Sequence, residues 1–217
     1  MNFIVGFMKS VINCLKHDNP LINKKLKEVS VEEGRTIATE LFQILNKRGD
    51  GIGLAANQVG IDAQVAVVNV IEPLVLINPK IIHKEFPIDY FEGCLSYPKK
   101  GTPTTRYRDI IIQTAQSESG WYFSGAEIPA DESRGSWEVE RKKKDSELRL
   151  LESVCVQHEI DHLNGITIHD REIKIEPTKV EKKIGRNQLV TIKKGDAVKV
   201  LKYKKVQNLL NQGWVME

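Results

Sequence analysis

Cysteine is scarce in this chain, and no hydrophobic run approaches the length of a membrane span. The three cysteines, Cys14, Cys94 and Cys155, are odd in number and widely spaced, so they do not suggest a disulfide framework. We therefore expect a reducing compartment, the cytoplasm in preference to an organelle. Because no apolar stretch reaches about 18 residues, neither a transmembrane helix nor a membrane partner is expected.

A strong net charge is also missing from the whole sequence, but the charge is unevenly distributed. The 32 Lys and Arg residues against 29 Asp and Glu residues give a net charge of only +3. Residues 170–217 hold 12 Lys and Arg and 6 Asp and Glu, a net charge of +6, so residues 1–169 hold 20 and 23, a net charge of −3. This contrast predicts a domain over 1–169 and a basic C-terminal extension over 170–217.

A His-Glu-x-x-His pattern is the most informative feature that is present, in Gln157-His-Glu-Ile-Asp-His-Leu163. On a helix, His158 and His162 would lie on one face, about 6 Å apart along the axis, where both can bind one cation. Glu159 could then take a proton from a water on the same ion. The pattern predicts a hydrolase site, and the alternative is a surface helix with two incidental histidines.

A catalytic metal usually takes three protein ligands and a water, so a third ligand is needed. The metzincin pattern would require a histidine at position 168, which is Ile168 here, and His169 misses the register by one residue. Cys94, in Glu92-Gly-Cys-Leu-Ser96, is the better candidate, although a single cysteine is more often a small buried hydrophobic residue. A thiolate with two imidazoles suits a divalent metal ion.

A third segment, Gly51-Ile-Gly-Leu-Ala-Ala-Asn-Gln58, allows the backbone to approach a ligand closely and ends in a side-chain amide that can donate to an oxyanion. It fits neither common phosphate-binding loop. A turn that ends a helix would explain the glycines of this segment. It would not explain why the segment occurs together with the other two motifs. Together, Gly51–Gln58, Glu92–Ser96 and Gln157–Leu163 resemble the three motifs of the peptide deformylase family, in the family's order.

The resemblance implies roles for individual residues. Cys94, His158 and His162 would be the metal ligands, and Glu159 the general base that acts in the hydrolysis of the formyl group from N-formylmethionine on nascent polypeptides. The Gln58 amide and the Leu95 backbone N–H would stabilise charge on the formyl oxygen. Substrate-binding residues would surround the methionine and its backbone: Ile52, Gly53, Glu92, Gly93, Leu151, Val154 and Cys155.

The resemblance also implies a cofactor and partners. One divalent metal ion per chain is expected, Fe(2+) in the cell, with Zn(2+), Ni(2+) or Co(2+) able to substitute. The partners would be N-formylmethionyl nascent peptides and, through the basic extension, the ribosome, whose RNA phosphates attract Lys and Arg. A solubilising appendage explains the extension equally well. No DNA partner is expected.

Two other functions remain open from the sequence. A zincin-like endopeptidase would take its third ligand from a downstream Glu or His and not from Cys94. A non-catalytic relative would bind formylated peptides or the ribosome without turnover, but it would have no chemical need for Glu159 or Gln58.

The expected fold is α+β, with mixed or antiparallel sheets around a central metal-binding helix. A capping box at Ser30 and Glu33 predicts a helix to about Lys47. Predicted strands cover 64–70, 74–82 with an interruption at Pro79, and 109–114, and the metal helix covers 148–164 and ends at Gly165.

Two regions are expected to depart from the family. Residues 116–147 predict a solvated insertion, with a longer hairpin around Trp121 and Trp137, or alternatively a lid or partner-binding element. In the extension, 191–203 predicts two short strands and 204–212 a short helix.

Overall fold

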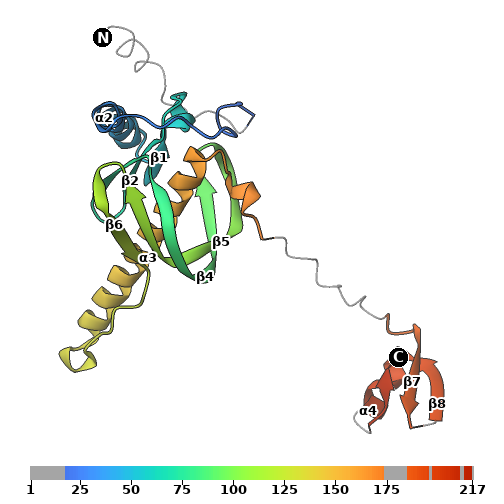
Figure 1. The fold of residues 1–217 in the computed structure, drawn as a ribbon. Coiled ribbons are helices and arrows are strands. Elements are labelled where there is room, and N and C mark those ends of the chain that lie inside the picture. The colour runs from blue at the N-terminus through green and yellow to red at the C-terminus, as the bar shows by residue number, and fades with distance from the viewer. Residues whose placement is uncertain (1–17, 174–184, 196, 211–212, 217) are drawn as a thin grey trace. The chain divides into compact units, whose positions relative to one another are not determined.

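The computed structural model describes residues 18–173, 185–195, 197–210 and 213–216. Cys14 therefore lies outside the described residues. The chain divides into two compact units, residues 1–173 and 174–217. The first unit holds all the predicted catalytic, metal-binding and substrate-binding residues. Its strands and helices appear from blue to orange in Figure 1.

Two antiparallel sheets and one long helix build the first unit (Figure 1). The first sheet has the order β1-β2-β3, from Gly53–Ala55, Val65–Asn69 and Pro73–Ile77. The second has the order β4-β5-β6, from Lys80–Cys94, Tyr97–Thr114 and Ser117–Ser124. Helix α3, Ser136–Leu163, packs against both sheets. The combination confirms the expected α+β class, with every strand pair antiparallel.

Helix α2, Val31–Arg48, forms where the capping box predicted it. The Ser30 side chain accepts a hydrogen bond from the Glu33 backbone N–H, and Gly49 ends the helix with φ of 71°. One face of the helix buries Ala38, Leu41 and Leu45 in an apolar cluster that also includes residues of β1 and β2. This helix therefore covers the first sheet.

Helix α3 is longer than the sequence predicted. It ends as expected at Leu163, before Gly165 with φ of 72°, but it begins at Ser136, 12 residues (148 − 136) before the predicted start. Most of its first half therefore lies within the insertion that was predicted over 116–147. Glu138 and Arg141 form an ion pair of 3.0 Å, three residues apart. Good helix formers and such pairs sustain a helix without an apolar stripe.

The predicted hairpin around Trp121 and Trp137 is wrong. Trp121 lies in β6 and pairs with Ile112 of β5, whereas Trp137 lies in the first turn of α3. The strand predicted over 74–82 with an interruption at Pro79 forms as two strands, β3 and β4. The break lies at Asn78 and Pro79, where Asn78 takes φ of 49°, and the two strands belong to different sheets. Three short 3-10 helices complete the unit: η1 Ala56–Val59, η2 Glu132–Arg134 and η3 Ile168–Asp170.

The second unit is a small sheet of order β8-β7-β9. Strands β7 Leu189–Lys194 and β8 Ala197–Lys202 confirm the two predicted strands, and α4 Gln207–Leu210, after the 3-10 helix η4 Tyr203–Lys205, lies within the predicted helix. Strand β9, Val215–Met216, was not predicted. Ile192 and Val206 are fully buried. Across the described residues of both units, no helix is long and apolar enough to cross a membrane.

Candidate metal centre

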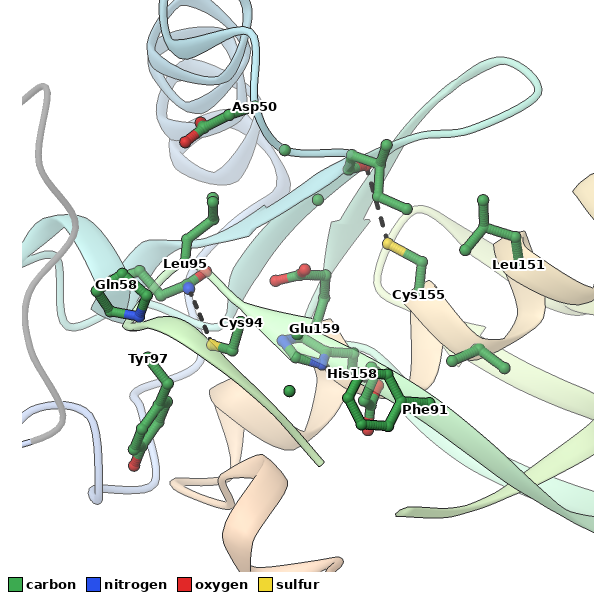
Figure 2. Close-up of a pocket in the computed structure, with 18 of the residues that line it drawn as sticks. Asp50, Gln58, Phe91, Cys94, Leu95, Tyr97, Leu151, Cys155, His158 and Glu159 are labelled. Atoms are coloured by element: carbon green, nitrogen blue, oxygen red, sulfur yellow. Dashed lines mark hydrogen bonds and ion pairs between the residues drawn. The ribbon is translucent and has the colours of Figure 1, made fainter. Parts of the chain in front are cut away.

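Three metal-ligating side chains meet where the end of β4 approaches α3. Cys94 is the last residue of β4, and His158 and His162 lie one turn apart on α3. Their ligand atoms all lie within 4.8 Å of one another. The Cys94 Sγ is 3.2 Å from Nε2 of His162, and Figure 2 shows Cys94 beside His158 at the base of a pocket. The strand and the helix thus bring together residues separated by more than 60 positions in the sequence.

Glu92 holds His158 in place. Its Oε2 lies 3.1 Å from Nδ1 of His158, which leaves the other ring nitrogen for the centre. Its Oε1 accepts hydrogen bonds from Thr104 at 2.7 Å and from Arg106 at 2.6 Å. Burial opposes ionisation of Glu92, but the hydrogen bond to His158 and the charge of Arg106 prevail and lower its pKa to about 2. Glu92 is therefore a carboxylate at neutral pH.

A buried ion network continues behind Glu92. Arg106 also donates to Asp161 at 2.5 Å, and Asp161 accepts from Arg171 at 2.8 Å and 3.0 Å. Arg106 and Asp161 are almost fully buried. The two arginines and two carboxylates satisfy one another, so the charges beneath the centre are paired.

His162 is anchored from a different direction. The Asn57 side chain donates to the backbone carbonyl of His162 at 2.8 Å, which ties η1 to α3. Burial and the neighbouring charge of His158 hold the pKa of His162 well below its usual value. A neutral imidazole is the form that binds a metal ion.

Glu159 points into the same space, and none of the described residues forms an ion pair with it. Its Oε2 is buried without a hydrogen-bond partner among the described residues. Burial raises its pKa to about 7, against the opposing influence of His158. Gly53 of β1 makes room for it, because a Cβ there would stand 2.3 Å from Oε1 of Glu159. A carboxyl group with a pKa near neutrality can accept and return a proton.

Gln58 is oriented by its own loop. Its Oε1 accepts from the Ala55 backbone N–H at 2.9 Å, so its Nε2 is directed towards Cys94 Sγ at 3.8 Å and Ser96 Oγ at 3.4 Å. The side chain is almost completely buried. The amide donor therefore faces the centre in a fixed direction.

A pocket of about 650 Å³ opens above the centre (Figure 2). All seven predicted substrate-binding residues line it, together with Gln58, Leu95 and Glu159. Of the predicted site residues, His162 alone does not line the pocket, because it lies beneath the floor at 1% exposure. Sequence reasoning missed Asn57, Arg106, Asp161 and Arg171. Asn57 and Asp161 stand inside the quoted motifs, whereas no local pattern marks the two arginines.

Two strand edges face this pocket. Strand β1 pairs only with β2, and β4 pairs only with β5, in the described part of the chain. Gly53 of β1 and Gly93 of β4 lie on these edges and line the pocket. An extended peptide placed between them could hydrogen-bond with both sheets.

The donor set fits a divalent transition metal. One thiolate and two imidazoles are a recognised catalytic combination, and three protein ligands leave a position open to the pocket. Glu92 supplies the carboxylate partner that metal-binding histidines usually have. The residues present therefore suit a mononuclear metal centre.

Comparisons with known proteins agree with this geometry. The sequence model of the polypeptide deformylase family matches residues 11–124 and 136–178. Within the insertion predicted over 116–147, residues 125–135 lie outside the matched segments. Among curated proteins, peptide deformylase of Buchnera aphidicola subsp. Acyrthosiphon pisum (strain Tuc7) is 34% identical over 167 residues, covering 75% of this chain and 83% of that protein. Peptide deformylase of Nitrosococcus oceani is 28% identical, covering 82% and 97%.

Solved structures show the same likeness. The crystal structure of peptide deformylase from Thermotoga maritima is 26% identical with a TM-score of 0.57, covering 74% of this chain and 97% of that one. A peptide deformylase from Synechococcus elongatus in complex with actinonin is 29% identical with a TM-score of 0.55, covering 75% and 79%.

Proposed function

The chain belongs to the peptide deformylase family, and from this premise we propose that its centre hydrolyses the formyl group of N-formylmethionine on nascent polypeptides with one divalent metal ion. The observation that carries the proposal is the convergence of Cys94, His158 and His162 with Glu159 and Gln58 at the base of one pocket. A metal ion held by the three ligands would supply a Lewis acid and lower the pKa of water towards neutrality. The reaction products are formate and a free N-terminal amine.

Glu159 acts as the general base. It accepts a proton from the attacking water and passes it to the leaving amine. Its burial supports this role, because a pKa of about 7 lets one carboxyl group both take up and return a proton near neutral pH. Its unpartnered Oε2 is available for that transfer.

Gln58 and Leu95 stabilise the charge that develops on the formyl oxygen. The Gln58 amide is held in position by the Ala55 backbone before substrate arrives, so little reorganisation is needed. The backbone N–H of Leu95 follows the ligand Cys94 directly in sequence and is the second donor. Leu95 also lines the pocket.

The substrate lies as an extended strand between the edges of β1 and β4. Its backbone pairs with Gly53 on one side and with Glu92 and Gly93 on the other. Its methionine side chain enters the part of the pocket formed by apolar residues, which are Ile52, Leu151, Val154 and Cys155. Leu151 and Cys155 face this space in Figure 2.

Fe(2+) is the native ion of this proposal, and Zn(2+), Ni(2+) or Co(2+) can replace it because one thiolate and two imidazoles accept each of them. The working place is the reducing cytoplasm, where the Cys94 thiol stays available. Cys94 and Cys155 are both free thiols in the described residues.

Residues 1–169 form the catalytic domain, and 170–217 the basic extension that contacts the ribosome. The composition of residues 185–216 supports this contact, because Asp196 is their single carboxylate against seven cations: Arg186, Lys193, Lys194, Lys199, Lys202, Lys204 and Lys205. Co-sedimentation with ribosomes over a salt series tests it. Binding that weakens steeply with salt and is lost without residues 185–217 is expected, and unchanged binding by the truncated protein would contradict it.

The decisive experiment measures formate release from formyl-Met-Ala-Ser by protein purified without oxygen. Turnover is expected with the wild-type protein and should vanish in Glu159→Ala while the metal content stays the same. Absence of turnover after loading with iron, nickel and zinc would overturn the proposed function in favour of a binding protein.

A further inference from the structure

An aromatic side chain stands at the rim of the catalytic pocket without an assigned role. Phe91 lines the pocket and is 70% exposed, the most exposed of the large hydrophobic side chains in the described residues. Figure 2 shows its ring below His158 in the view, among the residues that line the pocket. An exposed ring at such a place is free to cover apolar surface on a bound molecule.

The backbone of β5 holds this ring in position. A Cβ at Gly101 would stand 2.5 Å from Cε1 and 2.6 Å from Cζ of Phe91, so the ring lies directly on the glycine. Any other residue at position 101 would displace it. Although exposed, the ring is therefore supported from below by the neighbouring strand.

Strand alternation gives the direction in which the ring faces. Glu92 and Cys94 point towards α3, where they contact His158 and His162. Phe91, which precedes Glu92 in the regular part of the strand, therefore belongs to the opposite face of β4. Gly93 lies at the register shift between Glu92 and Cys94, next to this face. A Cβ at Gly93 would meet nothing within 4 Å, so the surface beside the ring is open. We name Phe91, Gly93 and Gly101 the outer shelf.

A peptide bound along β4 alternates in the same way. When its methionine side chain points inward to Cys155, the side chain of its second residue points outward, on the face of the outer shelf. We infer that Phe91 is a specificity-determining residue that contacts the second side chain of the formylated peptide and favours apolar residues there. This inference rests on the proposed function.

The chemistry of the ring sets the preference. A phenyl ring has no hydrogen-bonding group, so it gains from apolar area that leaves water and not from a charged or amide side chain. An enclosed pocket discriminates between side chains that differ by one methylene by roughly 10–200-fold. The outer shelf is open and covers only part of the second side chain, so its discrimination between peptides should fall near or below the lower end of that range.

The test compares kcat/KM for formyl-Met-Leu-Ser, formyl-Met-Ala-Ser and formyl-Met-Asp-Ser in the wild type and in variants. The wild type is expected to favour Leu over Ala by roughly five- to tenfold, through KM. Phe91→Ala should reduce that ratio to near one. Gly101→Ala, which keeps the ring but displaces it, should lower the ratio too. Phe91→Leu should retain part of it.

Tyr122→Ala is the matched control, because Tyr122 is 64% exposed on β6 and does not line the pocket. It should leave the ratio unchanged. The inference would be overturned if Phe91→Ala kept the wild-type ratio of kcat/KM between the Leu and Ala peptides. It would also be overturned if the variant lost the same factor in kcat/KM on all three peptides. Either result, with turnover intact, leaves the proposed function standing, whereas no turnover by the wild type on any peptide removes both.

Discussion

His158 and Glu92 are joined by a buried contact of 3.1 Å between Nδ1 and Oε2, and this contact fixes the imidazole that the metal centre needs. We predict that Glu92→Gln lowers metal affinity about 10–100-fold, since partners behind a metal ligand typically have that effect. Competition with a chelator measures it. Glu85→Gln is the control, because Glu85 pairs with the exposed His83 far from the centre, and it should leave affinity unchanged.

Cys94 should be indispensable for metal retention. Cys94→Ser replaces a thiolate by a poorly ionised hydroxyl, so the purified variant should lose its metal. Cys155→Ser tests the second free thiol, which is buried and donates to the Ile52 carbonyl, and it should keep the metal. Elemental analysis of both variants decides the point. Full metal content in Cys94→Ser would show that Cys94 is not a required ligand, and it would favour the endopeptidase alternative.

Gln58 should act on the rate and not on metal binding. Gln58→Glu keeps an oxygen that can accept from the Ala55 backbone but loses the amide donor. The loss of one such donor typically lowers kcat by about 10²–10³. Steady-state formate release, with metal content measured in parallel, provides the test. A variant with wild-type kcat would show that the amide does not contact the developing charge.

Gly165 should matter for stability more than Gly49, although both have positive φ. Left-handed backbone costs an alanine about 1–2 kcal/mol at either site. At Gly165 the added Cβ would also lie 2.7 Å from the backbone of Lys24, whereas nothing stands within 4 Å at Gly49. Gly165→Ala should therefore lose about 1–3 kcal/mol more unfolding free energy than Gly49→Ala. Equal losses in urea denaturation would contradict the close approach.

Asp109 should contribute stability that depends on pH. The hydrogen bond from Arg108 lowers the pKa of Asp109 against the effect of burial, with a further hydrogen bond from Ser124. Because the folded pKa lies below that of an unfolded aspartate, about 3.9, the contribution is complete above that pH and lost as pH falls through the folded value. Asp109→Asn should cost about 1–3 kcal/mol at pH 7.

Asp109→Asn should also make the decrease in unfolding free energy towards acidic pH less steep than in the wild type. Denaturation measured from pH 6 to pH 2 follows both effects. Asp89→Asn, which changes an exposed carboxylate on β4, is the control, and its unfolding free energy at pH 7 should match that of the wild type. An Asp109→Asn curve parallel to that of the wild type would contradict the linkage.

Cys94, His158 and His162 could be singled out from the sequence because they stand in short, dense motifs, and the structure brings the three together. His158 and His162 are four residues apart on one helix, a spacing that geometry alone interprets. Arg106 was missed because it joins Glu92 and Asp161 only through the pairing of β4 with β5, and no local pattern reports that pairing.

The elements that were misjudged have weak local periodicity. The first half of α3 is charged on all sides, so nothing apolar announces a helix before residue 148. Strand β4 is exposed along most of Lys80–Cys94, so it lacks the alternation that marks a half-buried strand. In both cases pairing with neighbouring residues, and not burial of an apolar face, decides the structure.

The proposed entry of the peptide between the edges of β1 and β4 has a consequence for when a new protein can be processed. A strand can enter between two edges only if its backbone hydrogen bonds are still unmade. A terminus already wound into a helix, or packed into its own core, presents no such backbone. Ribosomes add about 5–20 residues per second and domains fold during synthesis. The enzyme therefore has only a limited time in which to act. Its substrate is a protein's terminus in the short interval before that terminus acquires structure.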